Sequence, residues 1–191
     1  MAGKLIGVLA LQGAFIEHEK KIKQCGAQSR QVRTVEDLQD VEGLIIPGGE
    51  STAIGKQLAM DGFGDQIREM ALQGMPIFGT CAGMILLSKR IDQYNQYSLD
   101  LLDTLVKRNA FGRQVDSFET DIPIETLGEK KFRAVFIRAP YVLETGEGVD
   151  ILARYQDKIV FVRQGKILAS AFHPELTDDL RVHEYFVNMI D

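Results

Sequence analysis

The chain has 191 residues, 45% of them hydrophobic and 26% charged, which is the composition of an ordinary globular protein and a length suited to one domain. Its 22 basic and 27 acidic side chains give a formal net charge of -5, which argues against bulk nucleic-acid binding. With only two cysteines, a disulfide scaffold or a four-cysteine zinc site is excluded, and we expect no bound metal.

The first two-thirds of the chain alternates short apolar runs with helical patterns. Strands are expected at residues 5–11, 43–46 and 75–78. Helices are expected at residues 15–25, from a cap at Ser51 or Thr52 to residue 60, at 63–73 and at 84–88. The run 5–11 is too short to cross a bilayer and lacks a cleavage site, so we expect a cytoplasmic protein with no membrane contact.

The last third of the chain has a different pattern. Strand candidates separated by turns lie at residues 132–137, 151–155, 159–162 and 167–171, which suggests antiparallel hairpins. Asp178 or Asp179 is expected to cap a final amphipathic helix. Without repeats or linkers, residues 1–191 are expected to form one α/β domain. We predict a three-layer sandwich with a mostly parallel central sheet and antiparallel additions in the C-terminal third.

The most specific motif is Gly-Thr-Cys-Ala-Gly at residues 79–83, between an expected strand and an expected helix. It has the form of the nucleophile elbow Gly-x-Ser-x-Gly with cysteine in the serine position. The turn would lift Cys81 to a helix N-terminus, which favours a thiolate, and the Ala82 N–H would face a developing oxyanion. Taken alone, the motif is equally compatible with a buried cysteine in a glycine-rich turn.

A thiolate needs a proton partner, and His173 is the best placed of three histidines because it follows an expected strand. Glu175 lies two residues on and could fix the imidazole tautomer. The alternative is a histidine held in a turn by Pro174, beside a solvated glutamate. His18 and His183 lie in helical patterns among charged residues and are expected to be surface or structural side chains.

The third element is the turn Pro-Gly-Gly-Glu-Ser at residues 47–51, again after an apolar strand. Adjacent glycines let the backbone approach a ligand and present N–H groups to an anion. A phosphate-binding loop fits poorly because the glycine spacing is wrong and Gln57 stands where Ser or Thr is needed. An oxyanion hole formed by Gly48 and Gly49 is the better interpretation, with Glu50 free to meet a substrate ammonium. A cysteine, a His-x-Glu pair and this turn together suit acyl transfer through a thioester.

Six motifs spread along the chain resemble one family. They are Leu-Gln-Gly-Ala-Phe at 11–15, Pro-Gly-Gly-Glu-Ser-Thr at 47–52, Gly-Thr-Cys-Ala-Gly at 79–83, Arg-Asn-Ala-Phe-Gly-Arg-Gln at 108–114, Phe-Ile-Arg-Ala-Pro at 136–140 and Phe-His-Pro-Glu-Leu-Thr at 172–177. The elbow and His-Pro-Glu are common to many glutamine amidotransferases, whereas 108–114 and 137–140 resemble one subfamily. The chain thus resembles the glutaminase subunits of pyridoxal 5'-phosphate synthase, which are class I amidotransferases with a flavodoxin-like fold.

The resemblance implies that Cys81 is the nucleophile, His173 its base and Glu175 the orienting acid. It also implies glutamine contacts from Gly49, Glu50, Ser51, Arg108, Ile137 and Arg138. An arginine can bind the α-carboxylate of glutamine, and Glu50 can bind its α-ammonium. The reaction needs no metal or organic cofactor.

In the family, the ammonia passes to a synthase partner in a large hetero-oligomer, and docking of the partner activates the glutaminase. Gln12, close to the end of the first strand, is a candidate for sensing that docking. Two alternatives stay open at this point. One is a PfpI-like cysteine hydrolase, which would not release ammonia from glutamine, and the other is a non-catalytic partner-binding module on the same scaffold.

Overall fold

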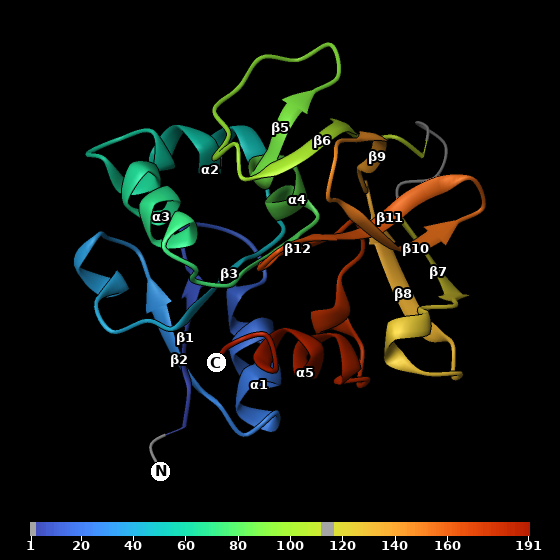
Figure 1. Cartoon of the computed structure of the whole chain (residues 1–191), viewed down its shortest axis with the longest axis horizontal. Helices are drawn as coiled ribbons and strands as arrows, with labels where there is room; N and C mark the ends of the chain where they lie inside the picture. Colours follow the sequence, from blue (N-terminus) through green and yellow to red (C-terminus); the bar gives the residue numbers. More distant parts are fainter. Residues whose placement is uncertain (1–2, 112–116) are drawn as a thin grey trace.

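The computed structural model describes residues 3–111 and 117–191 (Figure 1). Its strands are β1 (Leu5–Leu9), β2 (Gln28–Val32), β3 (Gly43–Ile46), β4 (Ile77–Thr80), β5 (Ser88–Ile91), β6 (Leu102–Lys107), β7 (Ser117–Ile122), β8 (Phe132–Ile137), β9 (Tyr141–Thr145), β10 (Asp150–Tyr155), β11 (Lys158–Gln164) and β12 (Ile167–Ser170). Its helices are α1 (Phe15–Gln24), α2 (Ser51–Leu58), α3 (Phe63–Leu72), α4 (Ala82–Leu87) and α5 (Arg181–Val187), with short 3-10 turns η1 (Glu36–Leu38), η2 (Glu125–Leu127) and η3 (Pro174–Leu176).

The main sheet has two halves of different character. Strands β2, β1, β3, β4 and β12 lie side by side and are all parallel. Beyond β12, strand β11 pairs antiparallel with β12, β10 and β9, and β9 pairs antiparallel with β6, whose other neighbour β5 is parallel to it. Strands β7 and β8 form a separate antiparallel pair. The predicted combination of a parallel sheet with antiparallel additions is confirmed.

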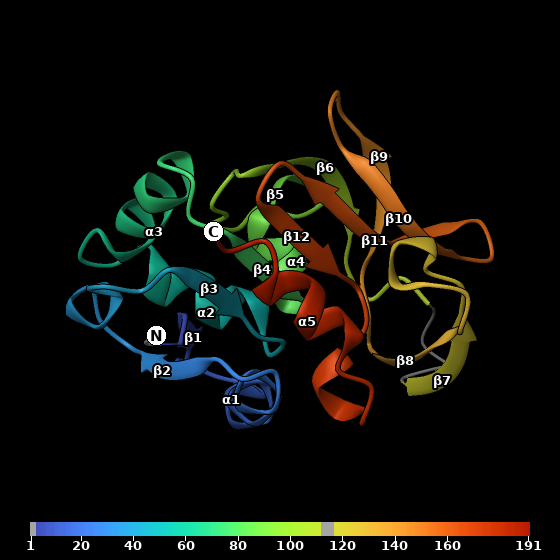
Figure 2. The same cartoon turned by 60° about the horizontal axis from the view of Figure 1, so that its bottom comes forward.

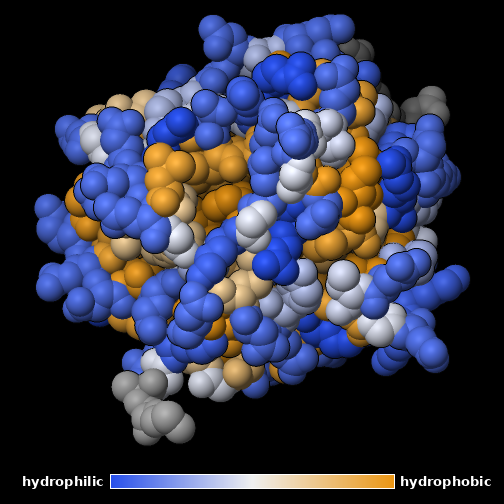
Figure 3. Space-filling model, viewed as in Figure 1, coloured by the Kyte–Doolittle hydropathy of each residue, from blue (hydrophilic) through white to orange (hydrophobic). Residues whose placement is uncertain are grey.

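Helices cover both faces of the parallel half. Helices α1 and α5 contact each other on one face, whereas α2, α3 and α4 pack on the other (Figures 1 and 2). Strands β3 and β4 are buried along their whole length, which explains their continuous apolar sequences. On the face shown in Figure 3, hydrophilic side chains form most of the outline and hydrophobic residues show mainly in the middle. No helix in the described part of the chain is long and apolar enough to cross a membrane.

Several element boundaries differ from the sequence prediction. The strand expected at 75–78 begins at Ile77 and continues to Thr80, and helix α4 begins at Ala82 rather than at residue 84. Helix α2 is capped by Glu50 instead of Ser51 or Thr52, because the Glu50 carboxylate accepts hydrogen bonds from two N–H groups of the first turn. Helix α5 begins after Leu180, so neither Asp178 nor Asp179 takes the expected N-cap position, although Oδ1 of Asp179 accepts the N–H of Arg181, the first residue of the helix, over 3.1 Å.

The pairing of β4 with β12 fixes the relative position of the two strand ends that lie next to the site. The parallel strands β4 and β12 pair residue for residue, with Gly79 opposite Ala169 and Thr80 opposite Ser170. Gly79 also packs against helix α4, since a Cβ on Gly79 would lie 2.5 Å from the carbonyl carbon of Gly83. This close approach of strand and helix requires glycine and sets the sharp turn between them.

Candidate functional site

Cys81 and His173 follow the ends of two neighbouring strands. Cys81 comes directly after β4, and its N–H donates a hydrogen bond of 2.8 Å to the carbonyl of Ser170, the last residue of β12. Cys81 has φ of 51° and ψ of -102°, a strained backbone for a residue with a side chain. His173 lies three residues beyond Ser170 and donates its backbone N–H to Val135 of β8 over 2.8 Å. The elbow predicted from the glycine pattern is present in the structure.

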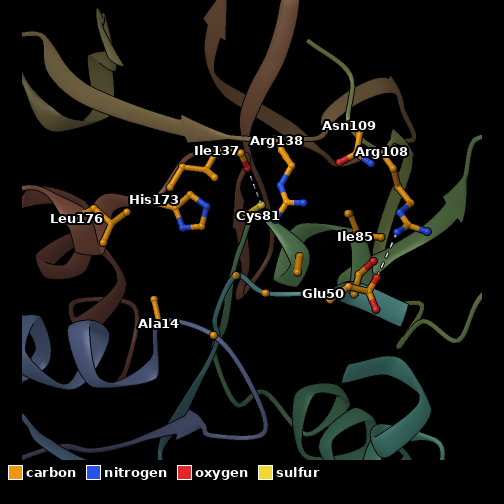
Figure 4. A pocket seen from close by; sticks show the side chains of 15 residues that line it. Ala14, Glu50, Cys81, Ile85, Arg108, Asn109, Ile137, Arg138, His173 and Leu176 are labelled. Atoms are coloured by element: carbon orange, nitrogen blue, oxygen red, sulfur yellow. Dashed lines mark hydrogen bonds and ion pairs between the residues drawn. The ribbon is translucent and has the colours of Figure 1, made fainter. Parts of the chain in front are cut away.

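The two residues open into a cavity of about 350 Å³ (Figure 4). The cavity is lined by Gly13, Ala14, Gly48, Gly49, Glu50, Ser51, Cys81, Ala82, Ile85, Arg108, Asn109, Ile137, Arg138, His173 and Leu176. Of the twelve site residues predicted from the sequence, ten line this cavity. The other two lie directly behind it, Glu175 against His173 and Gln12 against Gly49.

Cys81, His173 and Glu175, which we call the candidate triad, form one connected group. The Nδ1 atom of His173 lies 2.7 Å from Oε1 of Glu175, and Glu175 is buried. Burial opposes a charge on His173, but the neighbouring Cys81 and the hydrogen bond with Glu175 outweigh burial and raise the pKa of His173 to about 10. The Cys81 Sγ atom also lies 3.8 Å from the carbonyl oxygen of Ile137. The group can therefore hold a proton on His173 beside the sulfur.

The Gly-Gly turn faces the candidate triad. A Cβ on Gly48 would lie 2.5 Å from Cε1 of His173 and 3.4 Å from Cβ of Cys81, so only glycine fits there. Gly49 has a φ of 155°, which side chains rarely adopt. The N–H of Glu50 donates a 2.7 Å hydrogen bond to Oε1 of Gln12, so Gln12 holds this turn from behind. Ala82 opens α4 directly after Cys81, so both expected sources of oxyanion N–H groups, the Gly-Gly turn and Ala82, line the cavity together with Cys81.

Glu50 and Arg108 carry the charges on the other side of the cavity (Figure 4). The Oε1 atom of Glu50 lies 3.4 Å from Nη2 of Arg108, and the guanidinium stacks 4.1 Å from the ring centroid of Tyr94. The sequence suggested that Glu50 is free to meet a ligand. In the structure it also caps α2, because its carboxylate accepts hydrogen bonds from the N–H groups of Thr52 and Ala53. Burial opposes the charge on Glu50, but these two hydrogen bonds and Arg108 hold its pKa below its ordinary value.

The remaining predicted contacts come from the segments after β6 and β8. Arg108 and Asn109 follow β6, and Ile137 ends β8 with Arg138 next to it. A hydrogen bond of 3.0 Å from the N–H of Ala110 to the carbonyl of Ala139 joins the two segments. Asn109 and Arg138 both have positive φ, at 45° and 42°. Strained backbone thus gathers at the cavity. The motif residues 112–114 lie outside the described residues.

Two further histidines lie behind the candidate triad. His18 and His183 were expected to be surface or structural, yet both are fully buried, so a surface position is wrong. His18 lies 3.4 Å from Glu175, between Nε2 and Oε2. Helical spacing alone gave no signal for this, because the burial of His18 depends on α5 packing over α1.

Among residues 3–111 and 117–191, no group of three His, Cys, Asp or Glu side chains is arranged to hold a metal ion.

Comparison with known proteins identifies the family. The family model of the SNO glutamine amidotransferases matches residues 8–191. The chain belongs to this family. The amidotransferase is 58% identical over 182 residues to the pyridoxal 5'-phosphate synthase subunit PdxT of Pelotomaculum thermopropionicum, covering 95% of this chain and 93% of that protein. It is 54% identical over 185 residues to the same subunit of Carboxydothermus hydrogenoformans, covering 97% of each.

A solved structure of a glutamine amidotransferase has the same fold. It superposes with a TM-score of 0.92 at 51% sequence identity, covering 97% of this chain and 98% of that chain. The resemblance and the α/β fold predicted from the sequence motifs are thereby confirmed. The chain is a glutamine amidotransferase whose cavity is lined by a cysteine, a histidine, one glutamate and two arginines.

Proposed function

We propose that this amidotransferase is the glutaminase subunit of a pyridoxal 5'-phosphate synthase and hydrolyses L-glutamine to L-glutamate and ammonia. The observation that carries the proposal is the pairing of β4 with β12, which places Cys81 beside His173 at the wall of the cavity. Glu50 and Arg108 lie in the same cavity and present one acidic and one basic group. An α-amino acid carries the complementary pair of charges, with its side chain left to reach the cysteine.

The candidate triad suggests the order of events. The Cys81 thiolate attacks the carboxamide carbon of glutamine, and N–H groups of the Gly48–Gly49 turn and of Ala82 stabilise the oxyanion. His173 donates its proton to the departing ammonia, leaving a glutamyl thioester on Cys81. His173 then takes a proton from water, which attacks the thioester and releases glutamate. Throughout, Glu175 holds the Nδ1 side of the imidazole.

The remaining glutamine contacts are assigned by their place in the cavity. Arg108 binds the α-carboxylate and Glu50 the α-ammonium, while Ser51 lies at the start of α2 beside Glu50. Ile137 and Arg138 line the wall next to Cys81, where Ile137 presents its carbonyl oxygen to the sulfur (Figure 4). These contacts hold one end of the substrate while the other end reacts.

The partner of this subunit would be a synthase subunit that consumes the ammonia within a hetero-oligomer. Gln12 is the proposed link to that partner, because its Oε1 atom accepts the N–H of Glu50 and lies 3.2 Å from the position of a Cβ on Gly49. Gln12 lies in the loop between β1 and α1. The first turn of α1, which follows this loop, exposes the hydrophobic side chain of Ile16. A partner that contacts this loop would act directly on the oxyanion turn.

The test is ammonia release from glutamine, measured with and without the synthase subunit. We expect release that rises when the partner is added and that is lost in Cys81→Ala. A diazoketone analogue of glutamine should label Cys81, read by mass spectrometry of the peptides. Cys25→Ser is the matched control and should release ammonia normally, because Cys25 caps the far end of α1 and burial raises its pKa to about 11. Unchanged release by Cys81→Ala would refute the proposal.

A further inference from the structure

All three histidines of the chain lie in one connected group. The two oxygens of the Glu175 carboxylate face different rings: Oε1 is 2.7 Å from Nδ1 of His173, and Oε2 is 3.4 Å from Nε2 of His18. The other nitrogen of His18, Nδ1, is 2.9 Å from Nε2 of His183. The candidate triad therefore continues into the protein interior through two further imidazoles.

The two additional histidines come from the helices on one face of the sheet. His18 lies in α1 and His183 in α5, which pack together, and both rings are fully buried. Thr80, the residue before Cys81, points to the same place, with its Oγ1 atom 3.2 Å from Nε2 of His18. His18 thus contacts both strand ends that hold the candidate triad, through Thr80 on one side and Glu175 on the other.

The distances define where the protons lie. Oε2 of Glu175 is buried, has no hydrogen-bond partner among the described residues and faces Nε2 of His18 at 3.4 Å. A lone pair on Nε2 would repel this carboxylate oxygen, whereas an N–H there is attracted to it and can also donate to Oγ1 of Thr80, so the proton belongs on Nε2. Nδ1 of a neutral His18 is then an acceptor, and it takes the Nε2–H of His183. The Nδ1 atom of His183 is left as an unprotonated nitrogen, and it has no hydrogen-bond partner among the described residues. In the opposite arrangement, a lone pair of His18 would face the carboxylate and a buried N–H of His183 would be unsatisfied.

The surrounding charges agree with two neutral rings. Burial lowers the pKa of His18, opposed by the nearby carboxylates of Glu175 and Glu17 and reinforced by His173. Burial also lowers the pKa of His183, with His18 and Lys21 acting in the same direction. Burial opposes a charge on Glu175, but the His18 ring that faces it and the hydrogen bond and charge of His173 hold the pKa of Glu175 below its ordinary value, so Glu175 is the charged partner of the two neutral rings.

We propose that His18, held in its tautomer by His183, is a positioning residue that fixes the Glu175 carboxylate against His173. The inference rests on the proposed function, since the orientation of His173 matters only if it transfers protons at Cys81. Without the donor at Oε2, the carboxylate of Glu175 could rotate, and Oε1 would leave Nδ1 of His173. This rotation would slow proton transfer by His173. It would leave the binding of glutamine unchanged, because the proposed glutamine contacts lie elsewhere in the cavity.

Two amide substitutions at one position separate this role from simple packing. His18→Gln places an amide N–H near the position of Nε2, where it can still donate to Glu175. His18→Asn reaches only to the position of Nδ1, so it keeps the contact with His183 and loses the donor. For ammonia release in the presence of the synthase subunit, we expect His18→Gln to retain kcat within about threefold. His18→Asn should lower kcat on the order of tenfold with KM for glutamine unchanged.

The pH profile supplies a readout that loss of packing would not change. Loss of a donor to Glu175 raises the pKa of that carboxyl, so the acid limb of kcat should move to higher pH in His18→Asn and not in His18→Gln. Phe186→Leu is the packing control, because Phe186 of α5 is buried and packs against Phe78, with the two ring centroids 5.6 Å apart. It should lower Tm and leave kcat and the acid limb unchanged. Equal kcat losses in Phe186→Leu and His18→Asn would overturn the proposal.

Nitrogen NMR of 15N-histidine-labelled protein tests the contact independently of activity. With three histidines, the spectrum contains three rings. We expect His18 and His183 to be neutral Nε2–H tautomers at neutral pH, with the His18 signals displaced in Glu175→Gln. A proton on Nδ1 of His18 would overturn the proposal. If the wild-type chain and its partner release no ammonia, the proposed function fails, while this spectrum still decides whether His18 donates to Glu175.

Discussion

Glu50 and Arg108 lie 3.4 Å apart, and each of them is also engaged by a second group. Glu50 caps helix α2, and Arg108 stacks on the ring of Tyr94. Helix α2 and the segment after β6 thus meet at one charged contact on the side of the cavity opposite the candidate triad. The proposed recognition of glutamine uses two side chains whose positions are already set by the fold.

Substitution of Arg108 should weaken glutamine binding and leave the chemical step nearly intact. In Arg108→Met we expect KM for glutamine to rise roughly ten- to hundredfold, the equivalent of about 1.5–3 kcal/mol for a hydrogen bond to a charged group. Steady-state ammonia release against glutamine concentration measures this. Arg133→Met is the matched control, because Arg133 pairs with Asp121 over 2.8 Å on the exposed β7–β8 hairpin. The same KM in both variants would contradict the assignment.

Substitution of Glu50 separates its charge from its capping role. Glu50→Gln retains one of the two oxygens that accept from Thr52 and Ala53, so it keeps one of the two capping hydrogen bonds, and we expect a smaller loss of stability than in Glu50→Ala and a KM raised at least about tenfold. Glu50→Ala removes the cap as well and should lower the free energy of unfolding by about 1 kcal/mol. Urea unfolding and kinetics on the two variants check both expectations. A normal KM in Glu50→Gln would exclude an ionic contact with the substrate ammonium.

A methyl group at Gly48 should disable the site without unfolding the protein. The new Cβ of Gly48→Ala would lie 2.5 Å from the His173 ring, so the ring must shift, and we expect kcat to fall on the order of a hundredfold. Gly62→Ala is the control, because its Cβ would meet nothing within 4 Å while its φ of 71° is strained. That variant should lose about 1 kcal/mol of stability and keep its kcat. Full activity in Gly48→Ala would show that this wall can move.

The buried His18 and His183 should make the fold acid-sensitive. Their ordinary pKa is 6.5, and burial lowers both values in the folded chain. Below about pH 6.5 these two rings are therefore protonated in the unfolded chain and still neutral in the folded chain. As the pH falls further, the free energy of unfolding should decrease by up to about 1.4 kcal/mol per pH unit for each ring. Urea unfolding between about pH 6 and 5 measures the slope, because below the unfolded pKa of 6.5 His173, whose folded pKa is about 10, is protonated in both states and adds little to it. His183→Phe should reduce it, whereas a flat profile in the wild type would contradict neutral rings.

The sequence predicts the parallel half of the fold well because its strands are uninterrupted apolar runs. Residues 43–46 are bounded by glycine and proline, and β3 occupies that range in the structure. Strands β2, β6 and β9 were not expected, and neither were β5 and β7. These last two contain the polar sequences Ser-Lys-Arg-Ile and Ser-Phe-Glu-Thr-Asp-Ile, whose pairing is decided by partners distant in the chain. Local propensity carries little information about such edge strands.

The site residues on motifs were predictable, while those that support them were not. Cys81, His173 and the glycine turn are recognisable because a few residue types in fixed spacing are needed for the chemistry. His18 and His183 are 165 residues apart and meet only when α5 packs on α1. Their neighbours in sequence are charged, which indicates an exposed helix face. Glu50 was likewise expected to be unengaged, because short polar residues, rather than glutamate, are the usual helix caps.

Because β4 and β12 are paired directly, the geometry of the site does not depend on how long the chain between these two strands is. Between them the chain forms all of β5 to β11, yet the spacing of Cys81 and His173 depends on hydrogen bonds between adjacent strands. The exposed turn at residues 156–157, between β10 and β11, can therefore be lengthened or cut without changing that spacing. It is the natural place to insert a reporter domain or to create new termini by circular permutation.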